Sequence, residues 1–147
     1  MRKIIIPPVF VFISIIAIVL FYFKASTYNF IEFPFNLIGI GIMLLGFYMM
    51  GKARELFKKH KTTLMIQQSS SVVTEGVYSK TRNPMYIGMF LMLLGTGICF
   101  MNLFSLLVPF IFILLIRIIF IPTEERLMNE TFGKEYRDYK NKVGRWI

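Results

Sequence analysis

Two short polar strings interrupt an otherwise apolar chain, and their side chains could bind or transform a ligand. The first contains Arg82-Asn83-Pro84 directly before an apolar run, with Tyr78 and Tyr86 on either side. Asparagine is a favoured N-cap, and proline is a favoured first residue of a helix. Because a helix N-terminus offers N–H groups and partial positive charge to an anion, we expect an anion site here, reinforced by Arg82. Each residue alone also has an ordinary role, as a cap, a membrane anchor or part of an interfacial aromatic belt.

The second string follows another apolar run and contains Thr123, Glu124 and Glu125. Threonine can cap a helix and acidic residues suit its first turn, so a terminal helix alone explains these residues. The functional alternative is an acidic group at the membrane surface that binds a cation. Arg117 lies about one turn before the end of the run, where a charge either extends to the interface or faces an interior cavity.

Other kinds of site are excluded by residue counts. The chain has one cysteine, Cys99, and one histidine, His60, so it can form neither an internal disulfide nor a Cys/His zinc cluster. It also has no Gly-rich phosphate loop and no metal-ligand spacing, so we expect no metal.

The elements that must position the two strings are membrane helices. Apolar residues make up 56% of the 147 residues and charged residues only 17%, which excludes a soluble globule. A membrane-spanning helix needs about 17–25 apolar residues, and four runs qualify: Ile4–Phe23, Phe33–Met50, Met85–Met101 and Leu103–Ile121. We therefore predict an all-α integral membrane bundle of four transmembrane helices, with a cytoplasmic loop and a C-terminal surface helix. Residues 1–147 form a single membrane domain in this prediction.

The basic residues predict the orientation of the bundle. Fifteen of the seventeen Lys and Arg residues lie before the first run, between the second and third, or after the fourth. Because such residues concentrate on the cytoplasmic side, we expect both termini of this multi-pass protein to be cytoplasmic, in a prokaryotic cytoplasmic membrane. The net charge of +9 is then an orientation signal and an anchor to anionic lipids. We expect no nucleic-acid partner.

Shorter features predict how the helices connect. Asn102 alone separates the last two runs, which predicts a tight hairpin that brings the two polar strings to one level. Residues 52–62 read as a basic helical extension of the second run, and residues 125–139 as one helix on the membrane surface. Four glycines permit close helix packing, within one chain or in a homodimer: Gly39, Gly41, Gly46 and Gly95.

The polar strings and their order resemble the isoprenylcysteine carboxyl methyltransferase and phospholipid methyltransferase superfamily of integral membrane enzymes. The matching strings are Gly76-Val77-Tyr78, Arg82-Asn83-Pro84-Met85-Tyr86-Ile87-Gly88, Glu124-Glu125 and Phe132-Gly133-Lys134-Glu135-Tyr136-Arg137-Asp138-Tyr139. Together they cover about half of the chain, and the helical hairpin between them agrees with the superfamily's layout.

The resemblance implies that S-adenosylmethionine binds within residues 70–147 at the cytoplasmic rim, while a lipophilic acceptor enters from the bilayer. The implied cofactor contacts are Ser70, Ser71, Val72, Val73, Tyr78, Arg82, Asn83, Pro84, Met85, Tyr86 and Glu124. Glu124 suits the cofactor's ammonium group, and the helix start with Arg82 suits its carboxylate. Aromatic faces can receive the sulfonium cation. Catalysis can then rest on alignment and exclusion of water, without a dedicated acid–base pair.

Two departures from the superfamily's pattern concern the acceptor. Asn83 stands where the carboxyl methyltransferases usually have histidine, and Phe120 stands where they have an arginine four positions before the first glutamate. A carboxylate acceptor would need Arg117 as a substitute. An amine acceptor would need to lose a proton, and Glu125 is the candidate base.

Alternative functions remain open from the sequence. Membrane sterol reductases share a similar C-terminal core, but a reductase would need to bind a dinucleotide, for which the chain is short. A small four-helix transporter or a non-enzymatic membrane factor would also fit four spans. Proton-coupled exporters usually need a carboxylate within the membrane, and no predicted span contains Asp or Glu.

Overall fold

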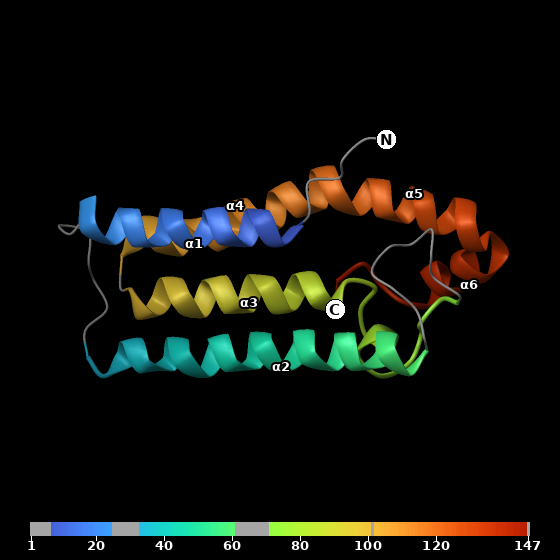
Figure 1. Cartoon of the computed structure of the whole chain (residues 1–147), viewed down its shortest axis with the longest axis horizontal. Coiled ribbons are helices and arrows are strands. Elements are labelled where there is room, and N and C mark those ends of the chain that lie inside the picture. Colours follow the sequence, from blue (N-terminus) through green and yellow to red (C-terminus); the bar gives the residue numbers. More distant parts are fainter. Residues whose placement is uncertain (1–6, 25–32, 61–70, 101, 147) are drawn as a thin grey trace.

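A computed structural model describes residues 7–24, 33–60, 71–100 and 102–146, and every regular element in them is helical (Figure 1). The prediction of an all-α fold is therefore confirmed. The elements are α1 (Pro7–Lys24), the 3-10 turn η2 (Phe35–Leu37), α2 (Ile38–Lys59), the 3-10 turn η4 (Gly76–Ser79), α3 (Pro84–Cys99), α4 (Leu103–Leu115), the π-helical turn η5 (Ile116–Phe120), α5 (Ile121–Phe132) and α6 (Lys134–Lys142).

Three helical stretches are long and apolar enough to cross a membrane: Pro7–Lys24, Phe35–Lys59 and Leu103–Phe132. The helix α3 is also apolar but has only 16 residues. The outer faces of these helices carry exposed large apolar side chains, such as Phe12, Leu44 and Phe110. Such a surface is typical of an integral membrane protein, because lipid rather than water surrounds it.

The bundle has α3 between α2 on one side and α1 with α4 on the other (Figure 1). Three of the four expected glycines pack α2 directly on α3. A methyl group at Gly46 would lie 2.5 Å from the Gly88 carbonyl oxygen, and one at Gly39 would lie 2.5 Å from that of Gly95. Small residues thus let the two backbones touch, as in many membrane helix pairs. Gly41, in contrast, has open space beside it.

The hairpin between α3 and α4 forms as predicted. Asn102 is fully buried, and its Oδ1 accepts hydrogen bonds from the backbone N–H groups of Phe104 (3.0 Å) and Ser105 (3.4 Å). This is the N-cap of α4. The short connection returns α4 alongside α3, so the start of α3 and the end of α4 lie at the same end of the bundle (Figure 1).

Beyond the apolar run of α4, the helix continues without a cap. In η5, the Ile121 N–H bonds the Ile116 carbonyl, five residues earlier. The prediction that Thr123 caps a new helix is wrong, because Thr123 lies inside α5 and its hydroxyl donates to the Ile119 carbonyl (3.2 Å).

The structure also corrects the expected surface helix over residues 125–139. Two helices, α5 and α6, occupy this region and meet at Gly133, whose φ is +53°. Glycine adopts this left-handed conformation without a steric penalty, so the chain turns there and α6 folds back. At the same end, α2 extends to Lys59, which confirms the predicted basic extension within the described residues; residues 61–62 lie outside them.

Candidate functional site

The two polar strings meet at one end of the bundle, as the hairpin predicts. The Tyr86 hydroxyl on α3 donates to Glu124 Oε1 on α5 at 2.6 Å. Arg82 Nη1, just before α3, donates to Glu125 Oε1 at 2.9 Å. Consecutive carboxylates on α5 therefore contact the start of α3 through two different side chains.

Of these two consecutive carboxylates, Glu124 has no charged partner among the described residues. It is partly buried just beyond the apolar run that ends at Ile121, and no basic side chain pairs with it within residues 7–24, 33–60, 71–100 and 102–146. Burial raises the pKa of Glu124 above its usual value, although the hydrogen bond from Tyr86 opposes this shift. A cation placed against this carboxylate would relieve its desolvation.

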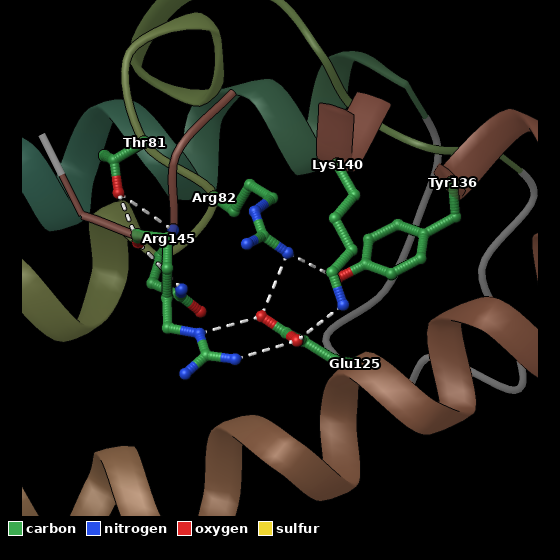
Figure 2. Close-up of polar contacts among 7 residues, drawn as sticks. Thr81, Arg82, Glu125, Tyr136, Lys140 and Arg145 are labelled. Carbon is green, nitrogen blue, oxygen red and sulfur yellow. Dashed lines mark hydrogen bonds and ion pairs between the residues drawn. The ribbon is translucent and has the colours of Figure 1, made fainter. Parts of the chain in front are cut away.

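Glu125, in contrast, binds three cations (Figure 2). Besides Arg82, it accepts from Arg145 Nε and Nη2 (both 3.0 Å) and from Lys140 Nζ (3.2 Å). Burial alone would raise the pKa of Glu125. The hydrogen bonds from Arg145 and Lys140 and the charge of Arg82 outweigh it, so this pKa lies below its usual value. Arg82 Nη1 also reaches the Tyr136 hydroxyl at 3.3 Å.

The C-terminal segment after α6 crosses the start of α3 and is held by main-chain contacts. The Arg145 carbonyl accepts from the Thr81 hydroxyl at 3.0 Å (Figure 2). It also accepts from Asn83 Nδ2 at 3.0 Å. The Gly144 carbonyl accepts from the Arg82 N–H at 3.0 Å. Asn83 thus occupies the N-cap position and Pro84 begins α3, as predicted, but the Asn83 side chain makes no capping hydrogen bond. It binds the C-terminal segment instead.

Aromatic and apolar side chains line the same end of the bundle. Tyr78 is buried, stacks on Phe57 with ring centroids 5.3 Å apart, and packs with Val73 and Met85. The Tyr139 hydroxyl donates to the Tyr78 carbonyl at 2.7 Å. Burial raises the pKa of both tyrosines, which keeps their hydroxyls protonated.

Most of the predicted site residues therefore lie at one end of the molecule. The structure gathers Ser71, Val72, Val73, Tyr78, Arg82, Asn83, Pro84, Met85, Tyr86 and Glu124 there, and Ser70 lies outside the described residues. Arg117 is not brought to the site, because it lies on the exposed face of η5. Of the two open alternatives for Arg117, the structure thus favours extension toward the surface. The assignment of Glu125 as a base stays a prediction.

Sequence reasoning missed Thr81, Lys140 and Arg145 as parts of the site. In the sequence, Lys140 and Arg145 are typical of membrane anchors, and no motif around them indicates that they bind Glu125. Tyr136 and Tyr139 did carry a signal. Their spacing of three residues places both on one helix face, and both are buried against Val72.

The arrangement suits a small ligand that carries charges of both signs. Glu124 offers a carboxylate without a cationic partner, and Arg82 Nε is buried without a hydrogen-bond partner among the described residues. Buried polar groups are normally satisfied, so each marks a place where a ligand's ammonium or carboxylate group could bind. Tyr78 and the apolar side chains around it can contact an aromatic ring.

Comparisons with known proteins agree with this geometry. The family model described as phospholipid methyltransferase matches residues 34–135. A protein-S-isoprenylcysteine O-methyltransferase from Schizosaccharomyces pombe is 31% identical over 128 residues, which cover 82% of this chain and 52% of that protein. The Saccharomyces cerevisiae protein of the same name is 42% identical over 79 residues, 50% of this chain and 30% of that protein. The chain thus spans about half, or less, of these yeast relatives. An uncharacterized protein from Haemophilus influenzae is 41% identical over 63 residues, 43% of this chain and all of that protein.

Proposed function

The chain belongs to the phospholipid methyltransferase family, and from this premise we propose that it transfers a methyl group from S-adenosylmethionine to a small lipophilic acceptor. The reaction takes place at the cytoplasmic face of a prokaryotic membrane, which the chain crosses four times with both termini inside. The 16 residues of α3 are equivalent to about 24 Å of helix, so α3 as the third span would cross a thinned part of the bilayer.

This proposal rests mainly on Glu124, which is partly buried. Among the described residues, its hydrogen-bond partner is the neutral hydroxyl of Tyr86, in the first turn of α3. An ammonium group fits this carboxylate. Pro84 has no N–H and the Tyr86 and Ile87 N–H groups bond the Asn83 carbonyl, so the group that fits a ligand carboxylate is Arg82 Nε, which has no hydrogen-bond partner among the described residues. The residues present therefore fit the two charged ends of S-adenosylmethionine. Tyr78, Val73 and Met85 would contact its adenine.

S-adenosylmethionine supplies a methyl group on a sulfonium, which a nucleophile can displace in one step. The protein's own contribution is then positioning and exclusion of water. The C-terminal segment, held by Thr81 and Asn83, covers the start of α3. Glu125 holds Arg82 and Arg145, and because its pKa is lowered, this geometry favours a positioning role over proton abstraction.

The acceptor in this proposal is the carboxylate or the amine of a lipid-like molecule that enters from the bilayer. The names of the yeast relatives support a lipid-borne carboxylate. Phe120 is buried where the carboxyl methyltransferases have an arginine, and Arg117 lies on the exposed face, which supports an amine. A methyl-transfer assay with prenylcysteine analogues and with aminolipids separates these two acceptors.

Calorimetric titration of the purified protein with S-adenosylmethionine tests the cofactor site. We expect wild-type binding and a loss of at least about tenfold in Glu124→Gln, because one charge-assisted interaction contributes about 1.5–3 kcal/mol. The matched control is Glu130→Gln, which removes an exposed carboxylate from the same helix. No binding by the wild type, or equal affinity in Glu124→Gln and the control, would contradict the proposal.

A further inference from the structure

A basic groove lies between α5 and α6, and Glu125, Lys140 and Arg145 are among the residues that line it. Its volume is about 510 Å³, and neither Glu124 nor Tyr86 lines it. The residues that matter for its chemistry are Pro122, Glu125, Arg126, Arg137, Lys140 and Arg145. The groove is thus separate from the proposed cofactor site.

The groove follows from helical spacing on both sides of Gly133. On α5, positions 122, 125, 126 and 129 share one helix face, and on α6, positions 136, 137, 140 and 141 share another. The turn at Gly133 folds these faces toward each other. The acidic residues Glu130, Glu135 and Asp138 lie outside the groove lining.

The groove has an excess of positive charge. Four basic side chains line it, together with one carboxylate, Glu125. That carboxylate is already bound by Arg145, Lys140 and Arg82. Arg126 and Arg137 do not bind it, and Arg126 has only a 3.8 Å exposed contact with Glu130. Their guanidinium groups are therefore available to an anion, and guanidinium matches phosphate geometry with two parallel hydrogen bonds.

The position of the groove relative to the membrane favours a lipid phosphate over other anions. Arg126 lies five residues beyond Ile121, where the apolar run ends, which corresponds to about 7.5 Å along the helix. The headgroup layer on each side of a bilayer is roughly 5–8 Å thick. With α4 crossing the membrane and its apolar run ending at the hydrocarbon boundary, Pro122 and Arg126 would lie within the headgroup layer, which contains the lipid phosphates.

We propose that the α5–α6 groove binds the phosphate group of an anionic phospholipid. The lipid would fix the α5–α6 end against the membrane surface, whatever the methyl acceptor is. Arg126 and Arg137 are the binding residues, and they lie outside the proposed catalytic machinery.

The test uses the full chain in detergent, titrated with short-chain phosphatidylglycerol, and native mass spectrometry to count bound lipid. We expect the double variant Arg126→Gln with Arg137→Gln to bind this lipid at least about tenfold more weakly. The matched control is Lys134→Gln with Lys142→Gln. It also removes two positive charges, but both lysines lie on α6 outside the groove lining. It should weaken binding less than about twofold, because exposed charges outside the groove are screened by water and salt. The same titration is repeated with short-chain phosphatidylcholine and with inorganic phosphate.

Equal losses in the two double variants would overturn the proposal, because they would indicate diffuse attraction rather than a site. Tight binding of inorganic phosphate, with displacement of the lipid, would also overturn it in favour of a soluble phosphate ligand. Binding of S-adenosylmethionine by the Arg126/Arg137 variant should stay unchanged. This measurement separates failure of the groove proposal from failure of the proposed function.

Discussion

Glu124 and Glu125 follow one another on α5, but they face two different regions of the molecule. Glu124 binds the neutral hydroxyl of Tyr86 on α3, whereas Glu125 binds three cations, Arg82 before α3, Lys140 on α6 and Arg145 in the C-terminal segment. Their pKa values accordingly shift in opposite directions. In the proposed function, the same residue type therefore binds a ligand at position 124 and holds the fold together at position 125.

The two shifts also give opposite effects of pH on stability. Glu125 has a lowered pKa, so its stabilising contribution is present at neutral pH and is lost as the pH falls through its folded-state pKa. Glu124 has a raised pKa, so any contribution from it is present at low pH and is lost as the pH rises through its folded-state value. Substitution of each glutamate in turn tests these opposite effects.

The largest expected effect is on stability, from Glu125→Gln. This change leaves the Arg82 side chain, only 9% exposed, without its counter-charge. Removing one partner of a buried ion pair typically costs about 3–5 kcal/mol, and we expect the lower end because Arg145 and Lys140 are partly exposed. Chemical unfolding in detergent measures the loss. Glu124→Gln should cost much less, and equal losses from the two variants would remove the contrast.

An intermediate effect is expected from pH on the proposed cofactor binding. The ammonium group needs an ionised Glu124, so affinity is full above the pKa of Glu124 in the free protein and falls about tenfold per pH unit below it. Because burial raises this pKa, the decline begins at a higher pH than an exposed glutamate would give. Calorimetry across pH should show it in the wild type, and a flat, weak profile in Glu124→Gln. A wild-type profile as flat as the variant's would contradict this role.

The smallest effect is expected from Tyr86→Phe, which removes the hydroxyl that donates to Glu124 at 2.6 Å. This hydrogen bond orients Glu124 and favours its ionised form, and a single hydrogen bond contributes about 0.5–1.5 kcal/mol. Its loss should therefore lower the affinity for S-adenosylmethionine by no more than about two- to tenfold. Since this hydrogen bond lowers the pKa of Glu124, the pH decline should also begin at a higher pH in the variant. A decline that begins at a lower pH would reverse the assigned effect of Tyr86.

The sequence predicts well those features that depend on neighbouring residues. Apolar runs locate the helices, Pro84 begins α3, and the short gap between the last two runs predicts the tight hairpin that joins α3, ending at Cys99, to α4, starting at Leu103. That hairpin is also why the meeting of the two polar strings could be predicted, because it fixes which helix ends lie together.

The features that the sequence does not predict depend on distant contacts. Asn83 is an intrinsically good capping residue, but the C-terminal segment offers its side chain a carbonyl, 62 residues away in the chain. Arg145 resembles a membrane anchor until α6 folds back at Gly133 and brings it to Glu125. Residues 116–120 also continue the apolar run of α4, so no local sequence pattern predicts the π-helical turn.

That single wide turn has a consequence for the whole site. A π-helical turn adds one residue to the helix, and each added residue rotates everything beyond it by about 100°. The backbone of η5 therefore determines the direction in which both glutamates point around the helix axis. Deleting one residue from Ile116–Phe120 would leave every side chain of the site in the protein, yet would swing Glu124 away from Tyr86.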